Sequence, residues 1–165
     1  MNPRVDTKPA SERLPDELVA SSTFLLKRLG FAAKQNAMSA YDEAGISPYQ
    51  FAVLVLLDEE GVHETQASIA DALGYDRGTL VGLLDELEQQ GLVERQRDPD
   101  DRRRHIVRVT ADGKRRLGKL RRLAAQLEDD FLAPLDGDER RTLHELLLRL
   151  ASLHEPGCAG PPAEG

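Results

Sequence analysis

Residues 66–110 read QASIADALGYDRGTLVGLLDELEQQGLVERQRDPDDRRRHIVRVT, and this stretch decides the fold. It contains two apolar stripes of helical period, separated by Gly74. These stripes predict two short helices joined by a three-residue turn, with Thr65 and Asp76 as N-caps. Because the small Ala70 allows a close crossing and Gly74 allows a positive φ, the second helix is expected to project outward, as in a helix-turn-helix.

A β-hairpin is expected directly after the second helix. Residues 92–97 and 104–109 alternate apolar with charged side chains, and the turn-forming sequence DPDD at residues 98–101 separates them. The tip of this hairpin is polar and basic. Plain helical hairpins can show similar spacing, but a basic hairpin in this position favours a winged helix-turn-helix.

Composition supports a mainly α fold with a small β-hairpin wing. The chain has 165 residues, of which 40% are hydrophobic, 31% charged and only 4% aromatic, a balance that suits one Leu-rich helical domain. The longest apolar run, residues 51–57, is far too short for a membrane helix, and the N-terminus has no secretory core. We therefore expect a cytoplasmic protein without a membrane partner. A single cysteine, Cys158, permits neither an intramolecular disulfide nor a cysteine-rich metal site.

Long helices are expected on both sides of the winged helix-turn-helix. Residues 16–42 predict one 27-residue helix, whose surplus length fits a partner-binding arm or, equally, a scaffold helix. A buried helix follows, with a capping box at Ser47 and an end at Gly61. Thr110 and Asp136 cap two further helices, the first with a leucine seam for a partner helix, and a Pro- and Gly-rich tail follows them. The chain is therefore expected to consist of a flexible arm at residues 1–15, a long dimerisation helix at 16–45 and the winged helix-turn-helix at 46–110. Two dimerisation helices at residues 111–154 and a disordered tail at 155–165 complete it.

The charge is distributed very unevenly. The net charge is -7, yet residues 102–122 carry ten basic side chains against one acid, which gives this segment +9 and leaves -16 for the rest. From Lys114 onward, a solvated helix face and a nucleic-acid surface explain the bases equally well. The position of Arg102, Arg103 and Arg104 at the hairpin tip favours nucleic acid.

The second helix of the helix-turn-helix presents a mixed outer face. Near its N-terminus, where the helix dipole favours phosphate, the residues that face away from the leucine stripe include Arg77, Thr79, Val81 and Gly82. Arg77 could contact guanine or a phosphate. Acids later in the helix should lie beyond any groove contact, since otherwise they would weaken the affinity; they are Asp85, Glu86 and Glu88.

The hairpin resembles the wing of the MarR family of bacterial transcription regulators. The family pattern is Asp, any residue, Arg, three residues, Val, any residue, Leu, Thr, two residues and Gly. This chain keeps the pattern at Asp101, Arg103, Val107, Thr110 and Gly113, and has valine where leucine is usual. The stretch DRGTLVGLLDELEQQGLVER is similar to the recognition helix and first wing strand of the family, although Glu86 stands where members often carry a base. The resemblance extends over about residues 16–154.

This resemblance implies a homodimer that binds a pseudo-palindromic operator in double-stranded DNA. The helices of residues 16–45 and 111–154 would form the dimer, a recognition helix would enter the major groove, and Arg103, oriented by an ion pair with Asp101, would enter the minor groove. A repressor released by a small-molecule effector is the expected activity. The DNA-binding residues are expected to be Thr65, Gln66, Arg77, Gly78, Thr79, Gly82, Arg95, Arg97, Asp101, Arg103 and Arg104. Among them, the resemblance implies phosphate contacts for Arg95, Arg97 and Arg104, and the same role is open to Thr65 and Gln66 at an exposed helix start.

Catalysis finds little support in the sequence. The four histidines are scattered, there is no phosphate-binding glycine loop or nucleophile elbow, and no cluster of metal ligands can be assembled. We therefore expect no enzyme, metal or cofactor, and no thiol sensing by Cys158 in the tail. The alternative function is a helical interaction module whose winged helix binds a protein.

Overall fold

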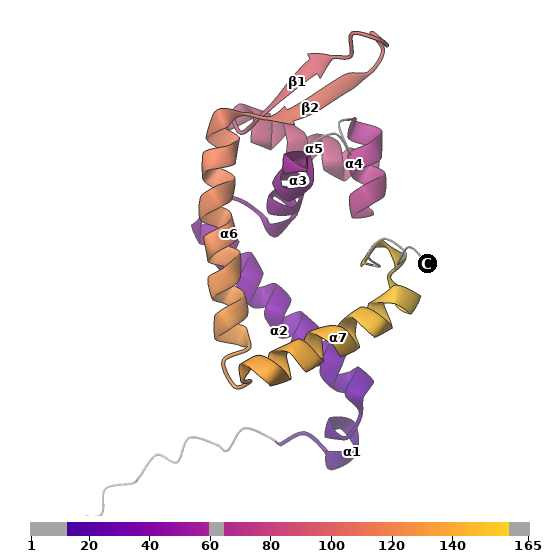
Figure 1. Ribbon diagram of the computed structural model, residues 1–165, viewed down its shortest axis with the longest axis vertical. Helices are drawn as coiled ribbons and strands as arrows, with labels where there is room; N and C mark the ends of the chain where they lie inside the picture. Colours follow the sequence, from indigo (N-terminus) through magenta and orange to yellow (C-terminus); the bar gives the residue numbers. More distant parts are fainter. Residues whose placement is uncertain (1–12, 60–64, 159–165) are drawn as a thin grey trace, which may run out of the picture. The chain divides into compact units, whose positions relative to one another are not determined.

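The computed structural model describes residues 13–59 and 65–158. The chain is mainly helical and, in this described part, its strands form one two-stranded antiparallel sheet, which confirms the predicted fold class (Figure 1). It divides into two compact units, Met1–Asn36 and Ala37–Gly165, with the boundary inside helix α2, Ser22–Glu43. No helix of the described residues combines the length and the apolar character needed to cross a membrane.

Two helices replace the single helix expected over residues 16–42. Helix α1, Asp16–Val19, ends before a break at Ser21, after which α2 begins. The Ser21 hydroxyl accepts a hydrogen bond from the backbone N–H of Phe24 at 3.3 Å, as an N-cap does. Serine competes for backbone hydrogen bonds and so favours a cap over a helix interior, which explains why the amphipathic pattern did not produce one continuous helix.

The third helix begins at its predicted capping box. In α3, Pro48–Asp58, the Ser47 hydroxyl accepts from the Gln50 N–H at 3.1 Å, and the Gln50 side-chain oxygen accepts from the Ser47 N–H at 2.8 Å. Helix α3 ends at Asp58, and the predicted end at Gly61 lies outside the described residues.

The two helices of the helix-turn-helix form where the sequence predicts them. They are α4, Gln66–Leu73, capped by Thr65, and α5, Arg77–Gln89, capped by Asp76. Gly74 between them has a φ of +65°, the left-handed conformation that glycine adopts without strain. The predicted three-residue turn is therefore confirmed.

The wing is an antiparallel hairpin. Strand β1, Val93–Arg97, pairs with β2, His105–Val109, in a register that places Val93 opposite Val109 and Arg97 opposite His105. An isolated bridge between Thr65 and Ile106 ties the start of α4 to β2. The wing is therefore fixed to the same end of the helix-turn-helix as the first residues of α4.

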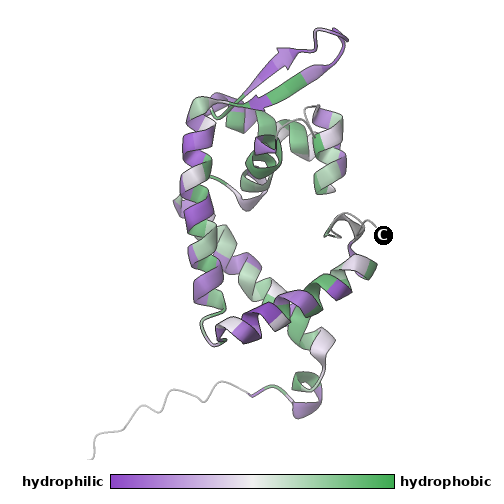
Figure 2. Ribbon diagram, viewed as in Figure 1, coloured by the Kyte–Doolittle hydropathy of each residue, from purple (hydrophilic) through white to green (hydrophobic). Residues whose placement is uncertain are grey.

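The core lies between α3, α4, α5, β2 and the first half of α6, Ala111–Phe131. Leu54, Ile69 and Leu84 are fully buried there. Figure 2 shows the hydrophobic colouring of α3 inside this group, whereas the tip of the wing is hydrophilic. The predicted leucine stripe of α5 thus faces the core and leaves the opposite face of that helix to solvent.

Two side chains hold α6 against the preceding helices. Arg116 donates a hydrogen bond to the backbone carbonyl of Ala44, just beyond the end of α2. Arg121 binds the carboxylate of Asp58, at the end of α3, at 2.9 Å. Part of the basic run therefore serves the fold rather than a partner.

The last helix is α7, Gly137–His154, which begins at the predicted capping box of Asp136 and Glu139. The expected disordered tail starts instead with a short 3-10 helix, Pro156–Cys158, in which the Cys158 N–H donates to the Glu155 carbonyl at 2.8 Å. The rest of that tail, residues 159–165, and most of the expected N-terminal arm, residues 1–12, lie outside the described residues.

Candidate nucleic-acid interface

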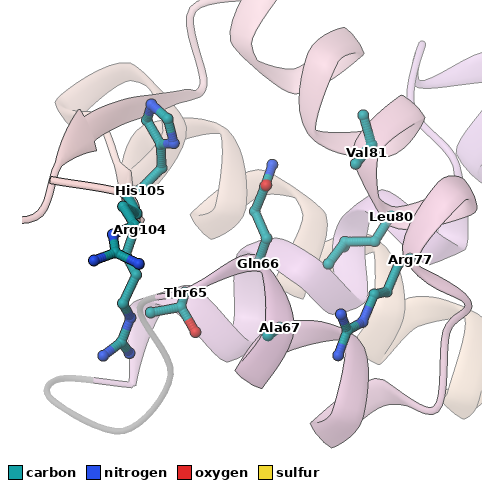
Figure 3. Close-up of a pocket in the computed structure, with 9 residues that line it drawn as sticks. Thr65, Gln66, Ala67, Arg77, Leu80, Val81, Arg104 and His105 are labelled. Carbon is teal, nitrogen blue, oxygen red and sulfur yellow. The ribbon is translucent and has the colours of Figure 1, made fainter. Parts of the chain in front are cut away.

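A cavity of about 490 Å³ opens where the start of α4, the first half of α5 and the wing meet (Figure 3). Five of the predicted DNA-binding residues line it together, and none of the lining residues that the structure describes is an acid. Three arginines give it a positive potential that suits an anionic partner. The described residues that line it are Thr65, Gln66, Ala67, Arg77, Leu80, Val81, Arg103, Arg104 and His105.

Thr65 and Gln66 enter the cavity from the start of α4. The Thr65 hydroxyl is occupied by its capping role, since it accepts from the Ser68 N–H at 3.2 Å and donates to the Ser68 hydroxyl at 3.0 Å. The Gln66 amide makes no hydrogen bond to another described residue. It is therefore free to bind a partner with both its donor and its acceptor.

Asp76 occupies the N-terminus of α5. Its carboxylate accepts from the Thr79 N–H at 2.9 Å and also from the Thr79 hydroxyl. These bonds favour the charged form and lower the pKa of Asp76, with the bond from the Thr79 side chain as the largest cause. The Asp76 carboxylate therefore already occupies the N-terminus of α5, where the helix dipole would otherwise attract a phosphate. In this turn, Arg77 is the group that can attract phosphate.

Local hydrogen bonds shape the wing tip. The Asp101 carboxylate accepts from the backbone N–H of Arg103 at 3.0 Å, and the Arg104 N–H donates to the Asp101 carbonyl at 2.9 Å. The expected ion pair between Asp101 and the Arg103 guanidinium is not formed in the described wing. A carboxylate two residues before an N–H makes an Asx-turn more readily, so Asp101 positions the Arg103 backbone and leaves its guanidinium exposed.

The acids of α5 are held by partners inside the protein. Arg95 on β1 binds Asp85 at 2.5 Å and Glu88 at 3.6 Å, and its side chain is only 20% exposed. Glu86 accepts a hydrogen bond at 2.7 Å from the side-chain amide of Gln50, itself almost fully buried. The negative charge that appeared unfavourable for DNA is thus partly compensated. The predicted phosphate-binding residue Arg95 supplies one positive charge to two of these three acids.

The remaining predicted residues lie around the cavity rather than in its lining. Gly78, Thr79 and Gly82 are on α5, Arg97 is exposed at the end of β1, and Asp101 is in the wing turn. His105 and Val81 line the cavity but were not among the predicted DNA-binding residues, although the sequence already placed Val81 on the outer face of its helix. His105 could have been found from its position as the first residue after the wing tip, directly opposite Arg97.

Comparison with known proteins agrees with this geometry. Residues 46–105 match the MarR family. A putative transcriptional regulatory protein for the hcr operon of Thauera aromatica is 32% identical over 152 residues, which cover 87% of this chain and 89% of that relative. The chain belongs to the MarR family. It is a DNA-binding transcriptional regulator and not an enzyme.

Solved MarR-family structures show the same fold. The transcriptional repressor CouR, bound to a 23-mer DNA duplex, matches with a TM-score of 0.75 and 34% identity, over 86% of this chain and 99% of CouR. CouR from Rhodococcus jostii RHA1 bound to p-coumaroyl-CoA matches with a TM-score of 0.67 and 28% identity, over 81% of this chain and 94% of CouR.

Among the described residues of this MarR-family chain, there is no group of three or more His, Cys, Asp or Glu side chains that could hold a metal ion.

Proposed function

We propose that this chain is a homodimeric repressor that binds a pseudo-palindromic operator in the cytoplasm and releases it when a small-molecule effector binds. The observation that carries the DNA-binding part is the cavity, which combines a free amide at Gln66 with the guanidinium groups of Arg77, Arg103 and Arg104, with no acid among its described lining residues. Amides and guanidinium groups are the side chains that read base edges and bind phosphates.

Each part of the site has a role in this proposal. Helix α5 enters the major groove, where Arg77 and Gln66 reach base edges, while Thr65, Gly78, Thr79 and Gly82 allow the backbone of DNA to approach. Arg103 enters the minor groove, and Arg97 and Arg104 bind phosphates beside it. Arg95 acts by pairing with Asp85 and Glu88, which reduces the negative charge that faces DNA.

The glycines of α5 support a close approach of DNA. Gly82 lies in the helix interior, and a Cβ added there would meet no atom within 4 Å. Packing inside the described chain therefore does not require glycine at this position, although glycine costs about 1 kcal/mol relative to alanine in a helix. A partner that lies against the helix backbone would account for it.

Exposed leucines support the homodimer. In the first unit, Leu29 and Phe31 are 53% and 62% exposed on α2, and in the second unit Leu150 and Leu153 are 49% and 76% exposed on α7. Exposed apolar side chains gathered on one element indicate a contact with another protein. The proposed dimerisation regions, residues 16–45 and 111–154, contain these helices.

Leu150→Glu is expected to break or weaken the dimer, because burying a carboxylate in an apolar interface is unfavourable. Sedimentation equilibrium of the variant should show a fall toward half of the mass of the unmodified protein. His144→Glu places the same charge on an exposed position of α7 away from Leu150, and its mass should stay that of the dimer. A Leu150→Glu dimer as tight as the original would contradict the assignment of α7.

Two CouR structures support the repressor and the effector. CouR is named as a transcriptional repressor, and it has been seen with a DNA duplex and with p-coumaroyl-CoA. A screen of aromatic acyl-CoA thioesters and aromatic acids, with release of bound duplex as the readout, tests whether this chain responds to such effectors.

DNA binding itself is tested by fluorescence anisotropy. Duplexes from the DNA that flanks the gene of this chain are compared with scrambled duplexes at several salt concentrations. With several phosphate contacts in each protomer, log affinity should fall with log salt with a slope of about -5 or steeper. Weak binding that is independent of both salt and sequence would overturn the proposal and favour a protein partner for the winged helix.

A further inference from the structure

Val81 is an apolar side chain in the middle of a basic surface. It lies on α5, is 41% exposed, and lines the cavity together with Arg77 of its own helix and Gln66 of α4 (Figure 3). Its neighbours Leu80 and Leu84 are buried in the core, so the helix places Val81 on the outer face. The solvent-facing side of an amphipathic helix normally carries charged or polar side chains. An exposed valine on this side is therefore better explained by contact with a partner than by solubility.

The surface next to Val81 carries little side-chain bulk. Gly78 and Gly82 lie three residues before it and one residue after it in the helix, and a Cβ on Gly82 would meet nothing within 4 Å. A flat partner that approaches this part of the helix can therefore reach the Val81 side chain without meeting a side chain at residue 78 or 82. Its β-branched side chain has one strongly preferred rotamer in a helix, so little freedom is lost when it makes a contact.

We propose that Val81 contacts the 5-methyl group of a thymine in each half of the operator. This inference rests on the proposed function, in which α5 lies in the major groove. There the thymine methyl is the one apolar group that distinguishes base pairs, and apolar side chains recognise it by contact. Arg77 and Gln66, which line the same cavity, supply the polar contacts that a methyl group cannot make.

The test removes the methyl group and nothing else. Once a bound duplex is found, each thymine is replaced in turn by 2′-deoxyuridine, and the Kd of the unmodified protein and of Val81→Ala is measured by anisotropy. At one position in each half-site, the replacement should raise the Kd of the unmodified protein about fourfold, the loss expected for one buried methyl group. The same replacement should leave the Kd of Val81→Ala unchanged, because the variant has already lost the contact.

Two controls separate the outcomes. Gln89→Ala changes an exposed residue of the same helix outside the cavity, and its response to deoxyuridine should match that of the unmodified protein. Thermal unfolding should show that Val81→Ala is folded. If no deoxyuridine position weakens the unmodified protein, or if Val81→Ala responds to every position as strongly, the inference is wrong. If no duplex is bound selectively, the proposed function fails instead.

Discussion

Gly113→Ala is expected to lower the free energy of unfolding by about 3 kcal/mol, the upper part of the range for overpacking a tight site. Gly113 is buried in the first turn of α6. A Cβ there would collide with the carbonyl oxygen of Leu92 and lie 2.7 Å from a methyl carbon of Val109. The Leu92 carbonyl also accepts the Thr110 N–H at 3.0 Å, so it cannot move without breaking the junction between the wing and α6.

Gly118→Ala is the matched control for this effect. It lies on the same helix, and a Cβ there would meet nothing within 4 Å. Alanine should therefore stabilise the protein by about 0.5 to 1 kcal/mol, since it is the better helix former. Urea denaturation of the two variants measures both effects, and equal stabilities would show that the contact between α6 and Leu92 is looser than the structure indicates.

The close contact at Gly113 also explains one part of the wing motif. The sequence showed a glycine three residues after Thr110, but not what required it. The structure shows that α6 must begin directly against the backbone of Leu92, where a side chain has no room. The glycine therefore sets how the wing joins α6.

Helix starts were predictable because their signals are local. Ser47, Thr65, Asp76, Thr110 and Asp136 each accept a hydrogen bond from an N–H two or three residues later. A short window of sequence contains both partners, so the pattern identifies the cap. The break at Ser21 was missed although its signal is also local, because the apolar stripe continues through it and competes with the cap.

Roles that depend on distant partners were not predictable. Gln50 and Glu86 are 36 residues apart, and only the packing of α3 against α5 brings them together. Arg95 looked like a phosphate-binding residue because the sequence does not show that its strand passes the acids of α5. Asp101 had two nearby donors in Arg103, and the turn geometry selected the backbone N–H. The sequence predicted which charges the site contains, whereas the fold determined how they are paired.

Arg103→Ala is expected to weaken operator binding by about 2 kcal/mol, or about 30-fold, without changing the mass of the dimer. The wing turn presents this guanidinium at the edge of the cavity, and the Asp101 carboxylate holds its backbone in place. The negative potential of a narrow minor groove should strengthen its contact. Anisotropy with the bound duplex measures the loss, and thermal unfolding should be unchanged because Arg103 is exposed.

Arg102→Ala distinguishes a specific contact from a general loss of charge. Arg102 is the exposed neighbour in the same turn, but it does not line the cavity. Its removal lowers the charge by the same amount, so long-range attraction to DNA falls equally in both variants. Only Arg103→Ala should in addition lose selectivity between operator and scrambled duplex, since Arg103 is the residue that we propose enters the minor groove. Equal losses in the two variants would show that the wing acts through its net charge, and the minor-groove role of Arg103 would have to be abandoned.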